Sequence, residues 1–231
     1  MDKGQFVREM FAAIAPRYDR TNRVLTAGID ERWRRVAVAQ LAPQPRASIL
    51  DLCCGTGDLT FHLLRTEPSL NVTGVDFCAP MLERARERAQ ASGAQATFVE
   101  ADVLALPCAD GSRDGAIMGF SMRNVVDIDL FLTEVKRVLK PGARFVNLDV
   151  SKPPNPIVRG AFNSYFYNVV PFVGARLGGS KAAYRYLPQS LTNYPDAQRL
   201  AECFRAAGFT NVRVRPLMLG AIAVHSGEVP A

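Results

Sequence analysis

The sequence predicts an α/β protein built on a doubly wound, mostly parallel, seven-stranded sheet with an antiparallel C-terminal strand. Strand patterns alternate with helical patterns throughout residues 46–150. This alternation is typical of parallel strands joined by crossover helices that cover both faces of a sheet. The last two strand patterns are separated only by Pro216-Leu217, and so short a link implies an antiparallel hairpin.

The first 45 residues predict a helical cap on the domain. Apolar residues at helical spacing indicate a short helix that ends before Pro16: Val7, Met10, Phe11 and Ile14. Asp30 has the chemistry of an N-cap and predicts a second helix that runs through Leu41.

Residues 46–150 predict the cofactor-binding core of the protein. Its five strand patterns cover residues 48–53, 71–76, 96–100, 115–120 and 144–150. Its helical patterns start at about residue 58 and cover residues 80–91 and 127–139. Pro80 suits the first turn of its helix because that position needs no backbone donor.

A long insertion at residues 151–195 follows this core. It is rich in aromatic residues and is the natural place for a substrate lid. Residues 196–231 predict a C-terminal helix over residues 196–207 and the hairpin strands 212–215 and 218–224. No repeat or low-complexity tract divides the chain, so we expect all 231 residues to form a single domain.

The composition is that of a soluble globular protein, with 48% hydrophobic and 22% charged residues. The longest uncharged stretch, residues 160–175, is shorter than the roughly 20 apolar residues that a membrane span needs. Five cysteines without a CxxC pair, together with two histidines, predict neither a disulfide framework nor a metal site. We therefore expect a cytoplasmic protein without a secretory signal. The net charge of +6 allows an anionic partner but does not choose between nucleic acid and a membrane surface.

A glycine-containing turn after the first strand predicts a cofactor site. It begins at Asp51, contains Gly55, Thr56 and Gly57, and opens the next helix. Such a turn lets a ligand approach the backbone at the carboxyl edge of the sheet.

Acidic residues at the ends of the next two strands indicate which ligand this turn binds. Asp76 can accept both ribose hydroxyls of an adenosine, and Asp102 can accept the adenine amino group. A dinucleotide would want glycine at Thr60 and would place its pyrophosphate beside Asp51 and Asp58. The pattern therefore favours S-adenosylmethionine. The alternative is a purely structural role in which Asp51 and Asp58 only cap the turn and the helix.

At this point the sequence resembles the C-methyltransferases of ubiquinone and menaquinone biosynthesis. The resemblance covers nearly the whole chain and rests most specifically on residues 10–19 and on the Phe120-Ser121-Met122-Arg123-Asn124 motif. Further matches are residues 28–34, 50–58, 184–187 and 220–227. The chain departs from the family pattern at Ser121, at Cys108 and at Cys53-Cys54.

The resemblance implies the fold of a class I S-adenosylmethionine-dependent methyltransferase. It also implies contact with the cofactor by one set of residues at the strand ends: Thr56, Asp76, Asp102, Val103 and Gly119. Asp51, Gly55 and Gly57 join this set from the turn itself.

The implied reaction, methylation of a quinol ring carbon, needs positioned reactants, oxyanion stabilisation and a proton acceptor. Arg123 could hold a phenolate oxygen and Asn124 the other hydroxyl, whereas the structural alternative pairs Arg123 with Asp127. Tyr18 is a ring contact or proton relay, or it only packs in the N-terminal cap.

Three further residues are candidates for substrate binding. His225 could accept a proton because its unperturbed pKa lies near 6.5, but a histidine on a terminal strand is more often structural. Tyr184 and Tyr186 could line the substrate pocket, with a structural role as the alternative.

One face of the insertion groups Phe162, Tyr165, Phe166, Val169 and Val173 at helical spacing. The structural interpretation is that this face belongs to an ordinary core helix. The functional interpretation is a wall for a polyprenyl tail, or a surface that makes transient peripheral contact with the inner face of the cytoplasmic membrane. Arg159, Arg176 and Lys181 flank this face and suit an anionic surface.

Four function hypotheses remain open. The preferred one is methylation of demethylmenaquinol to menaquinol, the last step of menaquinone biosynthesis, and the nearest alternative is a methoxy-benzoquinol in ubiquinone biosynthesis. Amino-methylating nucleic-acid enzymes commonly carry an Asn/Asp-Pro-Pro-aromatic motif after the fourth strand, whereas Pro153-Pro154 follows the fifth strand here. No basic run interleaved with aromatic residues marks an RNA groove either. An RNA methyltransferase is therefore disfavoured, and we expect no nucleic acid partner. A non-catalytic S-adenosylmethionine-binding regulator would not need Arg123 and Asn124. A homodimer is neither indicated nor excluded.

Overall fold

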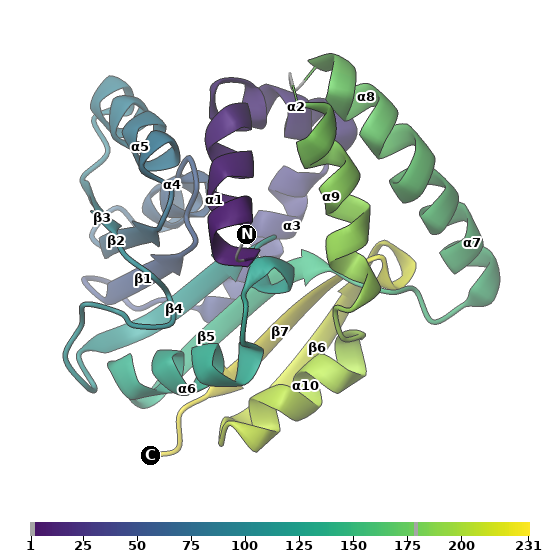
Figure 1. Cartoon of the computed structure of the whole chain (residues 1–231). Helices are drawn as coiled ribbons and strands as arrows, with labels where there is room; N and C mark the ends of the chain where they lie inside the picture. Colours follow the sequence, from purple (N-terminus) through teal and green to yellow (C-terminus); the bar gives the residue numbers. More distant parts are fainter. Residues whose placement is uncertain (1–2, 178–179) are drawn as a thin grey trace.

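A computed structural model describes residues 3–177 and 180–231. Residues 1–2 of the expected cap and 178–179 of the expected lid lie outside the described residues. The seven strands form one sheet in the order β3-β2-β1-β4-β5-β7-β6 (Figure 1). The strands are β1 Ser48–Leu52, β2 Asn71–Asp76, β3 Ala96–Glu100, β4 Arg113–Gly119, β5 Leu139–Val150, β6 Thr210–Leu217 and β7 Ile222–Glu228.

The sheet is parallel except for β7, which runs antiparallel to both β5 and β6. The predicted mostly parallel sheet with an antiparallel C-terminal strand is therefore confirmed. Its neighbour order reverses between β1 and β4, so the carboxyl ends of β1, β2 and β4 border one crevice.

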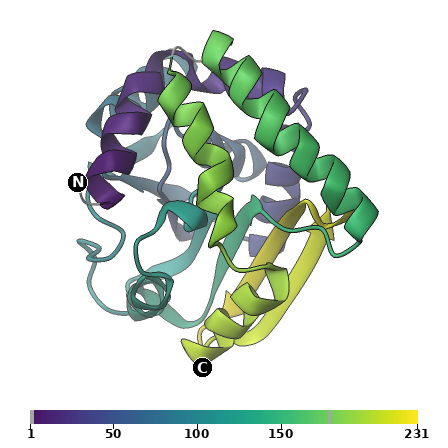
Figure 2. The same ribbon diagram turned by 45° about the vertical axis from the view of Figure 1, so that its right-hand side comes forward.

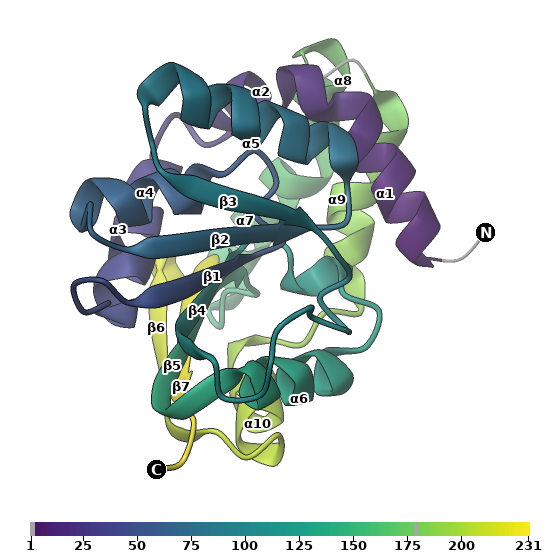
Figure 3. The ribbon, with the colours of Figure 1, turned by 90° about the vertical axis from the view of Figure 1, so that its left-hand side faces the viewer.

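Helices cover both faces of the sheet (Figure 3). One face carries α3 Asp30–Leu41, α4 Asp58–Thr66 and α5 Ala79–Ser92, and the other carries α6 Ile128–Val138 and α10 Ala197–Ala206. On the second face the rings of Phe131, Phe145, Phe204 and Phe209 form a closely packed aromatic core. This core fixes β5, from whose carboxyl end the chain leaves the sheet.

The N-terminal cap contains one helix more than the sequence predicts. Helix α1, Lys3–Ile14, ends before Pro16 as expected, but a 3-10 turn at Ala15–Arg17 leads directly into α2, Tyr18–Leu25. Proline is compatible with the first turn of the next helix, where its missing N–H leaves no bond unmade. This short turn brings Tyr18 back over the end of the sheet.

Asp30 is not the N-cap of α3, because the helix begins at Asp30 and Ile29 precedes it. The Asp30 carboxylate instead accepts a hydrogen bond from Thr26 and forms an ion pair with Arg34 one turn along the helix. The Asp30 carboxylate therefore binds a hydroxyl and a guanidinium in place of the free backbone N–H groups at the start of the helix.

The C-terminal hairpin is shifted by several residues from the expected strands. Pro216 lies inside β6, opposite Ala223, and the tip is the turn at Met218–Gly220. The proline is tolerated because β6 is an edge strand, where one backbone donor faces away from the ladder. The link between the strands is longer than predicted, while its antiparallel geometry is as predicted.

The insertion forms a long bent helix and a shorter one. The chain runs through α7 Pro156–Ser164, a π-helical segment at Tyr165–Val169 and α8 Val170–Leu177, and then through α9 Lys181–Thr192. Helix α8 packs on α9 and on α2, and α9 packs on α1 (Figure 2). The insertion thus stands next to the N-terminal cap. No helix among the described residues is both long and apolar enough to cross a bilayer.

Candidate active site

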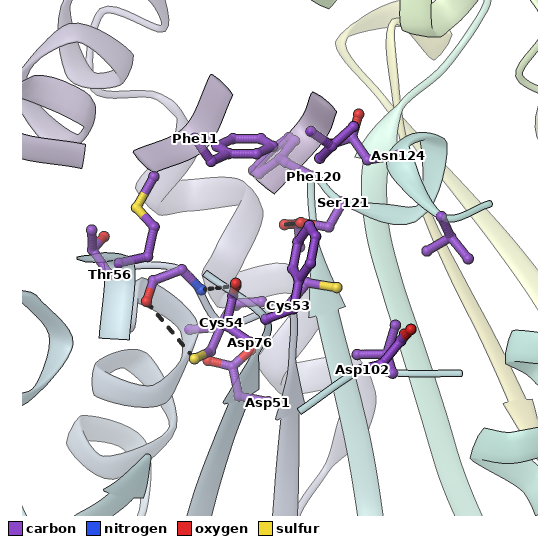
Figure 4. Close-up of a pocket in the computed structure, with 18 of the residues that line it drawn as sticks. Phe11, Asp51, Cys53, Cys54, Thr56, Asp76, Asp102, Phe120, Ser121 and Asn124 are labelled. Atoms are coloured by element: carbon purple, nitrogen blue, oxygen red, sulfur yellow. Dashed lines mark hydrogen bonds between the residues drawn. The ribbon is translucent and has the colours of Figure 1, made fainter. Parts of the chain in front are cut away.

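A pocket lies at the carboxyl ends of β1, β2 and β4, under helix α1 (Figure 4). Its lower part is made by strand ends and the turn after β1, and its upper wall is made by apolar residues of the cap. The residues that line it include Gly4, Val7, Phe11, Tyr18, Arg34, Asp51, Cys53, Gly55, Thr56, Asp58, Asp76, Phe77, Met81, Asp102, Val103, Leu104, Gly119, Phe120, Ser121, Asn124, Val125 and Val126. Most of the residues expected to bind the cofactor therefore lie around one cavity.

The turn after β1 takes left-handed backbone at Cys53, Gly55 and Gly57. Gly57 is not among the residues that line the pocket, and its contact with the cofactor stays a prediction. A Cβ on Gly57 would come within 2.9 Å of the Phe61 ring, and its φ is +86°. The glycine is thus required by the local helix start.

Asp51 anchors the turn to the following helix. Its buried carboxylate accepts hydrogen bonds from the Thr60 backbone N–H at 2.9 Å and from the Thr60 hydroxyl at 2.7 Å. Burial raises the pKa of Asp51 to about 7, against the lowering effect of these two bonds. Thr60, which stands where a dinucleotide site wants glycine, is the residue that holds this carboxylate in place.

Asp76 ends β2 and points into the pocket (Figure 4). It accepts backbone N–H bonds from Gly55 at 2.8 Å and from Cys78 at 2.9 Å. Burial raises the pKa of this carboxyl to about 6. Each carboxylate oxygen has one lone pair left, so the ionised form can accept two further hydroxyls.

The side of the pocket beyond Asp76 alternates acidic and apolar groups. Asp102 is exposed and accepts the Leu104 N–H at 2.9 Å, while Val103 beside it is buried. Phe77 and Met81 add apolar walls that the sequence interpretation did not assign. A flat aromatic base flanked by apolar side chains and a carboxylate at its edge fits this part of the cavity.

A polar latch joins the N-terminal cap to the turn. The Thr56 hydroxyl donates to Asp19 of α2 at 2.6 Å, and Arg88 of α5 donates to the Asp19 carboxylate at 3.2 Å. Arg88 also binds the Thr56 carbonyl and the Asp58 carboxylate, both at 2.8 Å. Sequence reasoning missed Arg88 because nothing in its helix distinguishes it from the other arginines of α5.

Arg34 is a buried cation of the pocket wall. It pairs with Asp30 and, at 3.0 Å, with Asp58, and its guanidinium lies 5.6 Å from the Phe120 ring. The sequence places Arg34 in the family's opening signature but gives it no role. The structure shows that it joins α3 to the loop after β4.

Tyr18 lies in the pocket wall with its ring edge against Phe11. Burial raises the pKa of the Tyr18 hydroxyl above its usual value. The phenol is therefore protonated at neutral pH and offers a hydrogen-bond donor to the cavity.

Asn124 and Arg123 follow β4 in a short 3-10 turn and have different surroundings. Asn124 lines the pocket, and neither atom of its buried amide has a hydrogen-bond partner. The Arg123 guanidinium does not line the pocket. It pairs with the buried Asp149 of β5 and donates to the Phe120 carbonyl at 2.6 Å.

Two expectations for Arg123 are thus corrected. Direct contact with the substrate does not fit a guanidinium turned toward β5, and the alternative partner Asp127 is wrong. Asp127 instead caps α6 by accepting the Leu130 N–H at 2.9 Å. Asp149 could not be recognised from the sequence because it is 26 residues away and meets Arg123 only across the sheet edge.

None of the three expected substrate residues lines the pocket. His225 is buried on the α10 face, where it binds the Ala197 carbonyl at 2.9 Å and stacks on Phe204, and burial lowers its pKa. Tyr184 packs with Met10 and Ile14 of the cap, and Tyr186 packs edge-on against Phe6. In each case the apolar body of the side chain found a packing partner, which is the structural alternative.

The pocket as a whole suits an adenosyl group with a cationic centre rather than a pyrophosphate. Asp51, Asp58, Asp76 and Asp102 outnumber its one buried cation, Arg34. Within the described residues, no cluster of three or more histidine, cysteine, aspartate or glutamate side chains could hold a metal ion.

Comparison with known proteins places the chain among methyltransferases. The model of the ubiE/COQ5 methyltransferase family matches residues 1–228. A demethylmenaquinone methyltransferase of Thermus thermophilus is 44% identical over 221 residues, covering 96% of this chain and all of that protein. A protein of the same name from Deinococcus radiodurans is 43% identical, covering 98% and 94%.

A third relative carries a broader name, and solved structures agree on the fold. The Desulfotalea psychrophila relative, a ubiquinone/menaquinone biosynthesis C-methyltransferase, is 40% identical and covers 98% and 92% of the two chains. A possible histamine N-methyltransferase of Thermotoga maritima superposes with a TM-score of 0.67 at 18% identity, covering 95% and 98%. An S-adenosylmethionine-dependent methyltransferase of Aquifex aeolicus gives 0.61 at 18%, covering 85% and 89%.

Proposed function

The chain belongs to the ubiE/COQ5 methyltransferase family, and we propose that it transfers the methyl group of S-adenosylmethionine to a ring carbon of demethylmenaquinol, which gives menaquinol. The observation that carries the proposal is the pocket itself. It joins the acidic strand ends to the unpartnered amide of Asn124 beneath an apolar roof.

S-adenosylmethionine supplies an electrophilic methyl group on a positively charged sulfur. The chain offers separate residues to the other parts of this cofactor. Asp76 would accept the two ribose hydroxyls, Asp102 with Val103 would hold the base, and Asp51 with Gly119 would lie near the ammonium group. Gly55 and Thr56 lie on the pocket side of the turn and let the ligand approach the backbone. The carboxylates favour a cation there and disfavour a phosphate.

The quinol would lie between Asn124, Tyr18 and the apolar roof of Val7, Phe11 and Val125. The buried Asn124 amide can hold one ring oxygen, because an unmade hydrogen bond is costly and a bound hydroxyl would satisfy it. Tyr18 can donate to the other oxygen as negative charge develops on it. Arg123 acts as a positioning residue that holds the turn carrying Asn124.

The chemistry balances without a covalent enzyme intermediate. As a quinol hydroxyl loses its proton, the ring carbon bonds to the methyl carbon, and the carbon–sulfur bond breaks with its electron pair going to sulfur. The ring carbon then loses its proton to a base, the ring oxygen takes back a proton and the ring regains aromaticity, so that one proton is released for each methyl group transferred.

A methoxy-benzoquinol is the second candidate substrate, because the Desulfotalea psychrophila relative is named for both quinone pathways. We further propose a cytoplasmic location, a lid role for residues 151–195 and peripheral contact with the membrane that holds a prenylated quinol. Nucleic acid is not part of this proposal.

The test uses short-chain demethylnaphthoquinone and methoxy-benzoquinone with methyl-labelled S-adenosylmethionine. We expect labelled product only after dithionite reduction, because an oxidised ring is a poor nucleophile toward the methyl group. A larger kcat/KM for the naphthoquinol supports demethylmenaquinol. Equal rates on rigorously oxidised and reduced substrate would refute the mechanism, and labelling of RNA but of neither quinol would refute the substrate class.

A further inference from the structure

The three most exposed large apolar side chains of the described residues lie at one side of the molecule. They are Ile157 of α7 at 82% exposure, Leu219 of the hairpin tip at 76% and Phe172 of α8 at 61%. The tip lies beside the start of α7, because Gly220 packs on Pro153 and Pro154, and Figures 1 and 2 show the two segments side by side. We call the exposed side chains of residues 156–177 and 218–219 the outer surface.

The π-helical segment determines which side chains of the bent helix reach this surface. Four positions at intervals of four residues face inward: Phe162, Phe166, Val170 and Gly174. They stay aligned because the π-helical turn is wider than an α-helical one. The expected face of residues 162–173 is thus divided: Phe166 is buried, whereas Tyr165 and Val169 are exposed. The Tyr165 hydroxyl donates to the Leu25 carbonyl and fixes the bend against the cap.

The hairpin tip holds its apolar side chains in solvent against a backbone preference. Met218 and Leu219 have φ values of +47° and +55°, a region that disfavours large side chains. Both side chains are more than half exposed, so burial in this molecule does not compensate for the conformation. A left-handed backbone that displays two large apolar side chains points to a partner outside the chain.

The segment that carries most of the outer surface has side-chain charge of one sign. Residues 151–195 contain no aspartate or glutamate but two lysines and three arginines, which gives +5 against +6 for the whole chain. Arg159 and Arg176 are exposed within the bent helix itself. The Arg176 guanidinium lies 4.8 Å from the centre of the Phe172 ring, so cation and apolar group are presented together.

We propose that the outer surface docks the protein onto an anionic lipid bilayer. Ile157, Phe172 and Leu219 would enter the boundary between headgroups and acyl chains, and Arg159 and Arg176 would bind lipid phosphates. The inference rests on the proposed function for its purpose, since a prenylated quinol resides in a bilayer. Its physical basis, apolar anchors on and beside a carboxylate-free segment, does not depend on that function.

A second copy of the chain fits this surface less well. A two-fold interface brings the same patch of both copies together, so each basic segment would face its own counterpart. Like charges in such an interface repel, whereas anionic lipid neutralises both. The charge therefore favours the bilayer over a homodimer through the same residues.

The test measures pelleting of the full chain with sucrose-loaded vesicles of phosphatidylcholine, with or without about one-third phosphatidylglycerol. One variant removes the anchors (I157S, F172S and L219N together, asparagine being tolerated at positive φ), and a second removes the charges (R159Q and R176Q). Matched controls are L130S on α6 and R205Q on α10, which are also exposed. We expect each test variant to bind anionic vesicles about tenfold more weakly or worse, and both controls to bind like the native protein.

Two further readouts distinguish the failures. Both variants should unfold at the Tm of the native protein, which shows that they are folded. If the native protein binds vesicles but turns over none of the quinols, the proposed function alone is overturned. Equal vesicle binding by native protein and both variants would overturn the docking surface. The docking surface would also be overturned if the native protein sediments as a dimer, the anchor variant sediments as a monomer, and neither binds vesicles.

Discussion

At the scale of single residues, the site depends on carboxylates held by backbone groups. Asp76 accepts two main-chain N–H bonds and still has room for two hydroxyls, while Asp51 is committed to Thr60. Both have raised pKa values because burial outweighs these bonds. Their protonation should therefore compete with cofactor binding close to neutral pH.

The affinity for S-adenosylmethionine should fall at acidic pH. With a pKa of about 6 in the free protein, Asp76 takes up a proton as the pH falls through 6, and the proton must leave when the ribose hydroxyls bind. We expect Kd to rise by up to about tenfold per pH unit below 6. Calorimetry of Asp76→Asn should give a weaker affinity with a smaller pH dependence. A native Kd that is constant between pH 5 and 8 would contradict this role.

Arg123→Ala should destabilise the fold strongly. It leaves the Asp149 carboxylate, 2% exposed, without its counter-charge, which typically costs about 3–5 kcal/mol. Arg123→Met combined with Asp149→Asn removes both charges and should recover more than half of the lost free energy of unfolding, measured in urea.

The same double variant decides what Arg123 does. Because the guanidinium faces β5, we expect kcat within about tenfold of the native value, with KM carrying most of the change. A stable double variant whose kcat falls by about 10²–10³ would instead assign a direct role in oxyanion stabilisation.

At the scale of elements, polar side chains attach helices α1 and α2 of the cap to the core. Thr56, Asp19 and Arg88 join α2, the turn and α5, and the Lys3 ammonium donates to the Val125 carbonyl at 2.8 Å. Helix α1 forms the roof of the pocket, so we expect the cap to move when a ligand enters or leaves. The hydrogen bonds of the latch are made with the pocket covered.

Arg88→Gln should speed cofactor release more than it lowers stability. The Arg88 side chain is one-third exposed, so its ion pairs are screened, and we expect an effect of about 1 kcal/mol. That corresponds to roughly a fivefold faster dissociation in stopped-flow fluorescence. Arg84→Gln, on the same helix and outside the latch, is the control. Equal dissociation rates in both variants would exclude the latch.

At the scale of the whole molecule, one sheet edge unites segments that are distant in sequence. The pocket takes residues from α1, from the ends of β1, β2 and β4, and from the turn after β4. A ligand that bridges these parts should stabilise the entire domain, because it binds only their folded arrangement.

S-adenosylmethionine at one hundred times its Kd should add about 2.7 kcal/mol to the free energy of unfolding. For a domain of this size that is a rise in Tm of about 5–10 °C. NAD at the same concentration should give no shift, because the pocket places carboxylates where a pyrophosphate would lie. A larger shift with NAD would reverse the choice of cofactor.

The sequence by itself determined the sheet, the cofactor turn and the acidic strand ends. These depend on local patterns, namely apolar strands, a glycine turn and the position of each aspartate directly after its strand. Because parallel strands bring their carboxyl ends to one edge, linear order was enough to group Asp51, Asp76 and Asp102.

Only the tertiary structure decided the partners of long side chains. Arg123 meets Asp149 across 26 residues, Arg88 meets Asp19 across 69, and His225 is committed to a carbonyl of α10. Such choices depend on which buried charge or carbonyl lies within reach once the layers have packed, and spacing along the chain does not encode that distance. The bend in α7–α8 is of the same kind, since a π turn moves Tyr165 and Val169 outward without any mark in the sequence.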